Sequence, residues 1–115
     1  MKSLLLATAI FGLVSPAFAQ DHSGHGAMTA DSPASAAYQA ANTAMHENMA
    51  VEFTGDADVD FIRGMIPHHQ GAVDMAKIVL QYGTDPEVKA LAEAVIKAQE
   101  DEIAWMNEWL AKKGQ

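Results

Sequence analysis

The fold is decided by residues 58–82, DVDFIRGMIPHHQGAVDMAKIVLQY, where apolar side chains recur with helical spacing over the whole stretch. At about 100° per residue these side chains gather on one face of a helix. The pattern therefore predicts one helix from about Asp58 to Tyr82, ended by Gly83. The members of its apolar stripe are Phe61, Ile62, Met65, Ile66, Ala72, Val73, Ala76, Val79 and Leu80.

Pro67 lies inside this predicted helix. A proline removes one backbone hydrogen bond and crowds the carbonyl of Arg63, at a cost on the order of 3 kcal/mol in a helix interior. We therefore expect the helix to be kinked or broken near Pro67, and a loop between two shorter helices is the alternative. His68 and His69 follow Pro67 directly. A residue this costly beside two potential ligands indicates that the local backbone shape serves a binding site.

Two further helices are predicted on either side. The later one opens with a capping box and an early proline in residues 84–87, runs to about Lys113 and is ended by Gly114. The earlier one starts at residues 31–33 and runs to about Ala50. Its apolar positions are Tyr38, Ala41, Met45 and Met49, with Phe53 as a further candidate. No stretch alternates with the period of a strand, so we expect an all-α, up-and-down bundle of three to four helices.

The amino-terminal residues indicate export. Residues 1–19 combine a basic start, a short apolar run and an Ala-x-Ala cleavage site, which is typical of a signal peptide for the periplasm. Cleavage leaves 96 of the 115 residues and, since Lys2 is lost, shifts the net charge from −8 to −9. We then expect a His/Gly/Ser-rich tail over residues 20–32 and a helical domain over residues 33–115. So acidic a chain disfavours nucleic acid as a partner, and we expect no membrane insertion.

The chemistry lies in methionine and histidine. On the helical wheel Met65 and His69 fall inside the apolar stripe of the predicted second helix, and His68 and Met75 lie at its edge. Thioether and imidazole ligands suit Cu(I) and Ag(I) and offer little to Zn²⁺ or Mg²⁺. The chain has no cysteine, as suits a metal site in an oxidising compartment. Each of these residues also has an ordinary interpretation, since methionine commonly fills cores.

Two polar residues of the third helix, Gln99 and Glu102, fall in the same arc as its apolar side chains, which include Met106. A buried carboxylate needs a partner, and Glu102 could accept the free N–H of a histidine, bind a metal directly or reach solvent. In the first helix Met45 and Met49 share a face, with His46 beside them; a lone His46 is otherwise an ordinary surface histidine.

The tail carries a separate candidate site. After cleavage the chain would begin Gln20-Asp21-His22, and a histidine in third position can bind Cu(II) together with the free amine and two amides; His25 follows closely. Cyclisation of the terminal glutamine would remove the amine ligand, and a plain polar tail is the alternative.

Residues 60–76, DFIRGMIPHHQGAVDMA, resemble the signature of the domain of unknown function family 305, and the run from Leu91 to Leu110 is similar to its second signature. This resemblance implies a ferritin-like helical bundle and, for characterised members, periplasmic binding of copper and silver. The matching positions are Met65, His68, His69, Met75 and Met106, with Met45, His46 and Met49 in a looser upstream segment.

We therefore expect a non-enzymatic copper-binding protein that carries Cu(I), acts in metal buffering, trafficking or tolerance, and meets a periplasmic delivery or efflux protein. A haem b electron carrier is one alternative, because histidine and methionine can be axial ligands. A metal-free structural or partner-binding role is another, and self-association could complete so small a bundle. A di-metal carboxylate oxidase is disfavoured, since the required Glu-x-x-His motif is absent.

Overall fold

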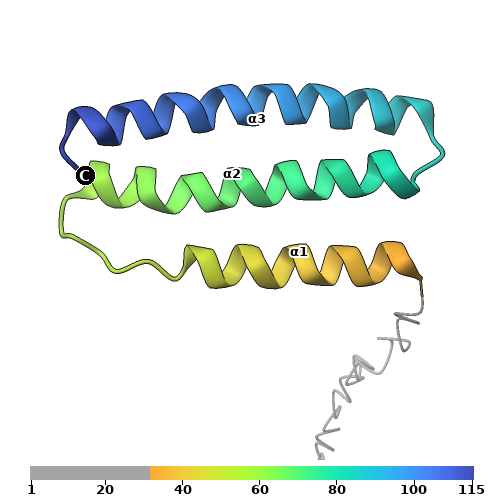
Figure 1. Ribbon diagram of the computed structural model, residues 1–115, viewed down its shortest axis with the longest axis horizontal. Coiled ribbons are helices and arrows are strands. Elements are labelled where there is room, and N and C mark those ends of the chain that lie inside the picture. The colour runs from red at the N-terminus through yellow and green to blue at the C-terminus, as the bar shows by residue number, and fades with distance from the viewer. Residues whose placement is uncertain (1–31) are drawn as a thin grey trace, which may run out of the picture.

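The computed structural model describes residues 32–115, and over that range the chain consists of three α-helices without a strand. Helix α1 spans Pro33–Met49, α2 spans Ala57–Tyr82 and α3 spans Pro86–Lys112. Successive helices run antiparallel to one another across the view of Figure 1, so the predicted all-α, up-and-down bundle is confirmed with three helices. No helix within the described range is both long and apolar enough to cross a membrane.

Each helix begins at a side-chain cap. The oxygens of Ser32, Asp56 and Asp85 accept hydrogen bonds from backbone N–H groups in the first turn that follows. Caps of this kind typically contribute about 1 kcal/mol each. In α3 the cap is Asp85, one residue later than the predicted capping box begins. At the other end Gly114 takes a positive φ of 72°, the conformation that ends the helix after Lys113.

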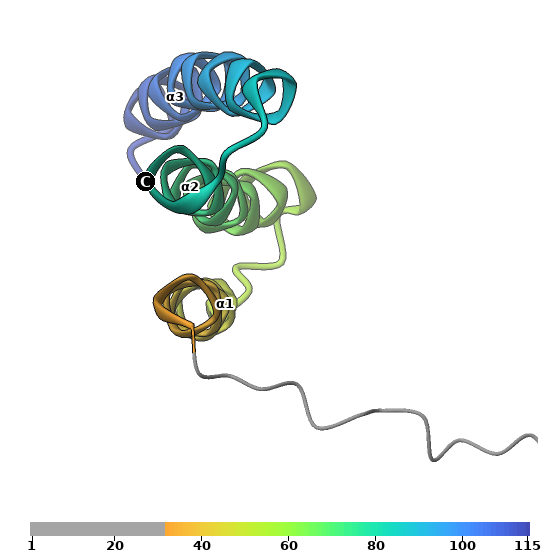
Figure 2. The ribbon, with the colours of Figure 1, turned by 90° about the vertical axis from the view of Figure 1, so that its right-hand side faces the viewer.

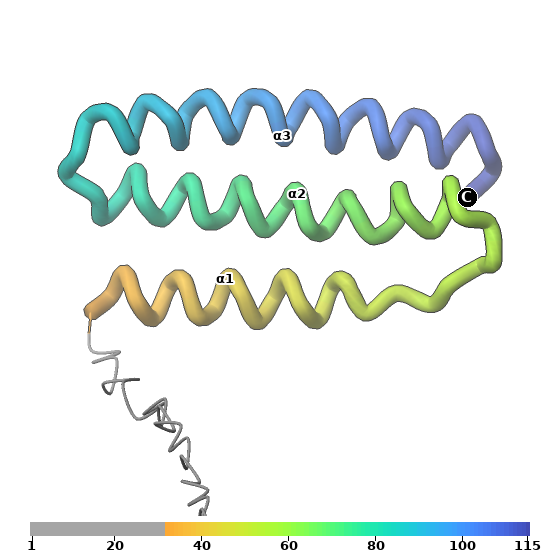
Figure 3. Tube along the Cα trace, turned by 180° about the vertical axis from the view of Figure 1, so that it is seen from behind, coloured from red at the N-terminus to blue at the C-terminus, as the bar shows by residue number. Residues whose placement is uncertain are grey.

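Helix α2 is continuous through Pro67. The expected break, and the alternative of a loop between two shorter helices, are therefore wrong. A single missing hydrogen bond to the carbonyl of Arg63 is local, whereas α2 packs against α3 along its length and against α1 over its carboxyl-terminal part (Figure 3). This packing outweighs the intrinsic cost of the proline.

The three helices form an open layer with α2 in the middle. Helix α1 packs on one side of α2 and α3 on the other, and within the described residues α1 and α3 do not touch (Figure 2). The sequence suggested a bundle closed on itself. Within residues 32–115, no helix covers a long face of α2 and α3.

The core is correspondingly small. Among the described residues the buried apolar side chains come only from α2 and α3: Val59, Ile62, Val73, Ala76, Ala92 and Met106. Helix α1 has no buried residue and rests on α2 where Met45 lies against Gly71. Phe53, the candidate extension of the α1 stripe, lies beyond the end of that helix and is 82% exposed, so this expectation was wrong.

Candidate functional site: a methionine and histidine cavity

The centre of the site is a short contact between α2 and α3. Nε2 of His69 lies 2.6 Å from Oε2 of Glu102, and the His69 side chain is only 16% exposed. Of the possibilities considered for Glu102, the contact with a histidine is present, and its side chain also reaches solvent, since it is 60% exposed. An Nε2–H that donates to this carboxylate leaves the other ring nitrogen, Nδ1, with a free lone pair.

That second nitrogen has no partner. Nδ1 of His69 is buried and makes no hydrogen bond with any described residue. An unsatisfied buried polar atom costs about 1–3 kcal/mol, and such atoms in native proteins call for an explanation. A bound ion would supply one, since a neutral imidazole lone pair is a metal ligand.

His69 lines a cavity of about 300 Å³ between α2 and α3. Two thioethers line the same cavity: Met65, one turn before His69 on α2, and Met106, one turn after Glu102 on α3. Met106 is buried, and Met65 is half-buried. The remaining wall consists of Phe61, Ile62 and Trp105. The structure thus brings Met65, His69, Met106 and Glu102 together, four of the residues singled out from the sequence.

The aromatic part of this wall was not anticipated. Trp105 is not among the candidate residues named from the sequence, yet it borders the cavity and remains 58% exposed. Its position directly before Met106 and three residues after Glu102 was the available signal, because residues three apart on a helix share a face.

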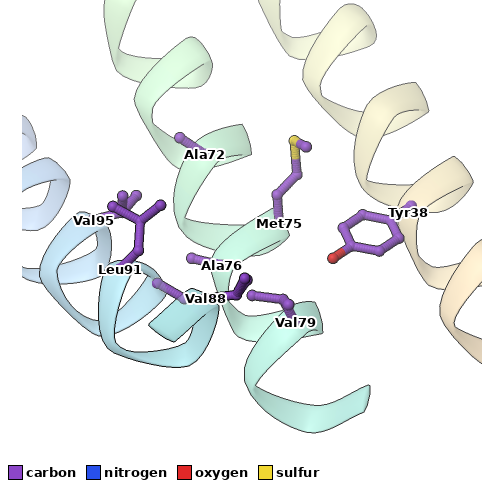
Figure 4. A pocket seen from close by; sticks show the side chains of 9 residues that line it. Tyr38, Ala72, Met75, Ala76, Val79, Val88, Leu91 and Val95 are labelled. Carbon is purple, nitrogen blue, oxygen red and sulfur yellow. The ribbon is translucent and has the colours of Figure 1, made fainter. Parts of the chain in front are cut away.

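The other members of the predicted α2 cluster lie elsewhere. Met75 is exposed and lines a second cavity, of about 310 Å³, together with Tyr38 of α1 (Figure 4). His68 is exposed, with its ring centroid 6.1 Å from that of His69 and the two rings inclined at 61°. His68 and Met75 therefore do not share the cavity of His69, although His68 lies beside it.

The methionines and histidine of α1 form a separate group. An added Cβ at Gly71 would lie 2.5 Å from Sδ of Met45, so this sulfur covers α2 between His68 and Met75. Met49 is one turn further along α1 and partly exposed. His46 is exposed, and its Nδ1 lies 2.8 Å from the carbonyl oxygen of Asn42, to which it donates. This group lies on the side of α2 opposite the His69 cavity.

Three further candidates complete the comparison with the sequence. Gln99 is half-buried on α3, one turn before Glu102. His22 and His25 lie outside the described residues. Among residues 32–115 no three His, Asp or Glu side chains gather closely enough to hold a metal ion.

Fold and site together define a small all-α protein with a thioether and imidazole cavity between two antiparallel helices. The profile of the domain of unknown function family DUF305 matches residues 58–115, which contain both helices that build this cavity, and the chain belongs to this family. It is also similar to the uncharacterized protein L153 of Acanthamoeba polyphaga mimivirus, with 39% identity over 56 residues. That match covers 49% of this chain and 37% of the viral protein.

Proposed function

We propose that this protein binds Cu(I), and the chemically similar Ag(I), in the cavity lined by Met65, His69 and Met106. The observation that carries the proposal is one cavity lined by two methionines and by His69, whose second ring nitrogen has no hydrogen-bond partner among the described residues. Soft monovalent ions accept such ligands in sites of low coordination number.

Glu102 supports this interpretation from outside the ligand set. Ligating histidines commonly donate their second N–H to a carboxylate, which fixes the tautomer and orients the ring. The 2.6 Å contact between His69 Nε2 and Glu102 Oε2 has that form, and it directs the free lone pair to Nδ1. Met65, His69 and Met106 carry no charge as ligands. The single positive charge of a Cu(I) or Ag(I) ion would therefore be balanced by the carboxylate of Glu102, which lines the same cavity.

The biological role follows from this chemistry and from the sequence. Residues 1–19 have the features of a signal peptide, so we place the protein in the periplasm, where it would buffer or carry the ion without catalysing a reaction. Thioether ligands are neutral and weak, so the bound ion stays labile enough to pass to a delivery or efflux protein. The haem b alternative gains no specific support from the cavity residues.

The test is a competition titration of the metal-free chain, starting at Gln20, with Cu(I) against a chromogenic chelator under reducing, anaerobic conditions. Met65→Leu and Met106→Leu remove a sulfur at nearly constant volume, so the fold should persist. We expect each to weaken Cu(I) binding at least about tenfold, in the range seen when support of a metal site is lost. Reducing conditions keep a Cu(II) site at His22 from contributing.

Met75→Leu is the matched control, because Met75 is a methionine of the same helix that lines the other cavity. It should leave Cu(I) affinity almost unchanged. Failure of the wild-type chain to compete with the chelator would refute copper binding. Equal losses in all three variants would refute this cavity as the site. Binding of Ag(I), followed by the methyl resonances of the methionines, should single out Met65 and Met106.

A further inference from the structure

The uncovered face of α3 is apolar over most of its length. Leu91, Ala98 and Trp105 are spaced seven residues apart, so they lie on one line along the helix within roughly 40° of each other. Leu91 is 64% exposed and Trp105 58%. The core residues Ala92 and Met106 point toward α2 instead. The apolar sector of α3 is therefore wider than α2 can cover.

Two charged side chains border this line between Ala98 and Trp105. Asp101 lies one turn from each of these residues and Glu102 one turn from Ala98, and their side chains are 69% and 60% exposed. Asp101 pairs with Lys97, and Glu102 pairs with His69. The line itself, from Leu91 through Ala98 to Trp105, carries no charge, which on so acidic a protein is unusual for a surface that faces water alone.

The same face carries a projection and a hollow. Trp105 projects near one end of α3, and the cavity of about 310 Å³ lies near the other end, between Tyr38, Met75 and Leu91 (Figure 4). Its remaining walls are alanine and valine side chains. Leu91 lies seven residues before Ala98 and Trp105 seven residues after it. The hollow beside Leu91 and the projecting Trp105 are therefore each about 10 Å from Ala98 along the helix, in opposite directions.

We propose that a second copy of this chain covers this face, with a two-fold axis at Ala98. The α3 helices of the two copies then pack antiparallel, and Trp105 of each copy enters the hollow beside Leu91 of the other. A two-fold axis makes the same patch serve both copies. The small Ala98 at the axis lets the two helices approach closely.

The exposed area suits such an interface. The large exposed apolar side chains of this face are Phe61, Met75, Val88, Leu91 and Trp105. Aromatic side chains bury about 150–250 Å² each and aliphatic ones somewhat less, so their exposed parts come to roughly 500 Å² per copy. A standard interface buries about 800 Å² per partner, of which about 56–65% is apolar. The exposed apolar area of this face therefore matches the apolar area that one partner buries in a standard interface.

A second copy fits better than an unrelated partner because the face is complementary to itself. An unrelated protein would have to supply both a hollow for Trp105 and a projection for the cavity, whereas a copy supplies both by symmetry. The small core also favours self-association, since association is a common way for a small domain to bury enough apolar surface. This inference does not depend on copper, and it is tested on metal-free protein.

The test is the mass in solution, measured by light scattering after size exclusion, of the chain that starts at Gln20. We expect twice the mass of one chain. Ala98→Arg places two like charges against each other at the axis and should weaken association at least about 100-fold. Ala104→Arg is the matched control: Ala104 is also exposed on α3 but lies roughly 120° around the helix from Ala98, so this variant should remain dimeric.

A cross-linking experiment fixes the orientation. The chain has no cysteine, so Ala98→Cys introduces one thiol per copy. A short bis-maleimide should join Ala98→Cys copies efficiently and leave Ala104→Cys copies unjoined. A wild-type chain that is monomeric up to millimolar concentration would overturn the proposal, as would a dimer that Ala98→Arg leaves intact. Equal circular dichroism of all variants excludes misfolding as the cause of a monomer.

Discussion

At the scale of single residues, Gly71 is a position where α1 approaches α2 closely. A Cβ there would lie 2.5 Å from Sδ of Met45, 2.8 Å from Cγ and 3.1 Å from Cβ. Sδ can rotate away, but the Met45 Cβ is fixed to the α1 backbone. We expect Gly71→Ala to destabilise the protein by up to about 2 kcal/mol, because overpacking costs about 1–3 kcal/mol and the gain in helix propensity offsets about 1 kcal/mol of that. Urea unfolding measures the difference.

Gly64 provides the control for this prediction, because it lies two turns earlier in α2 and an added Cβ meets no atom within 4 Å. Gly64→Ala should stabilise the protein by about 0.5–1 kcal/mol through propensity alone. The additional change Met45→Ala should relieve part of the Gly71→Ala penalty. If both glycine variants were stabilised equally, α1 would not rest on Gly71 as described.

At the scale of elements, Asp60 ties the α1–α2 connection to the start of α2. Its carboxylate accepts from the backbone N–H of Thr54 at 2.8 Å, from the Thr54 hydroxyl at 2.8 Å and from the N–H of Gly55 at 3.1 Å. These bonds, that from the Thr54 N–H foremost, hold the pKa of Asp60 below its usual 3.8.

A depressed pKa fixes the sign of the pH dependence. The Asp60 contribution to stability is complete above pH 3.8 and is lost as pH falls through the lower pKa of the folded state. Asp60→Asn should therefore lower Tm at neutral pH, and its difference from the wild type should shrink below pH 3.8. Asp58→Asn, in the same turn, should lower Tm less at neutral pH, because the Asp58 carboxylate accepts none of these hydrogen bonds. A difference that stays constant down to pH 2 would contradict this account.

The helices themselves were largely predictable from the sequence. Cap residues and the terminal glycines placed the ends of α1, α2 and α3 within a residue or two, because capping depends on side chains next to the helix end. Continuity at Pro67 was not predictable in this way. A local rule states the cost of the proline, whereas the packing of α1 and α3 on either side of α2 decides the outcome.

The candidate site was predictable in part. Spacing placed Met65 and His69 on one face, and the cavity confirms their proximity to Met106 and Glu102. Spacing could not show that Met75 belongs to another cavity, because a wheel gives the direction of a side chain and not the helix that covers it. The same limit explains Leu91, which lies on the apolar stripe of α3 and yet is exposed.

At the scale of the whole molecule, the open layer gives its two sides different roles. One side of α2 carries α1 with the Met45 group, and the other packs against α3 around the His69 cavity. Trp105 connects the two proposals, because it borders that cavity and also projects from the uncovered face. For this reason the dimer test uses Ala98, which does not line the cavity.

The layer also predicts the order in which the molecule opens. Helix α1 has no buried residue and, among residues 32–115, packs on α2 alone, so its detachment exposes little apolar surface. Helices α2 and α3 share the core, and a dimer would stabilise them further. We expect hydrogen exchange in the middle of α1 to proceed through an opening on the order of 2 kcal/mol less costly than that of the middle of α2. Mass spectrometry of exchange in residues 38–45 and 69–76 compares the two segments in one sample. Equal opening free energies in both would mean that the three helices unfold as one cooperative unit, and the layer would then be held together more tightly than its contacts suggest.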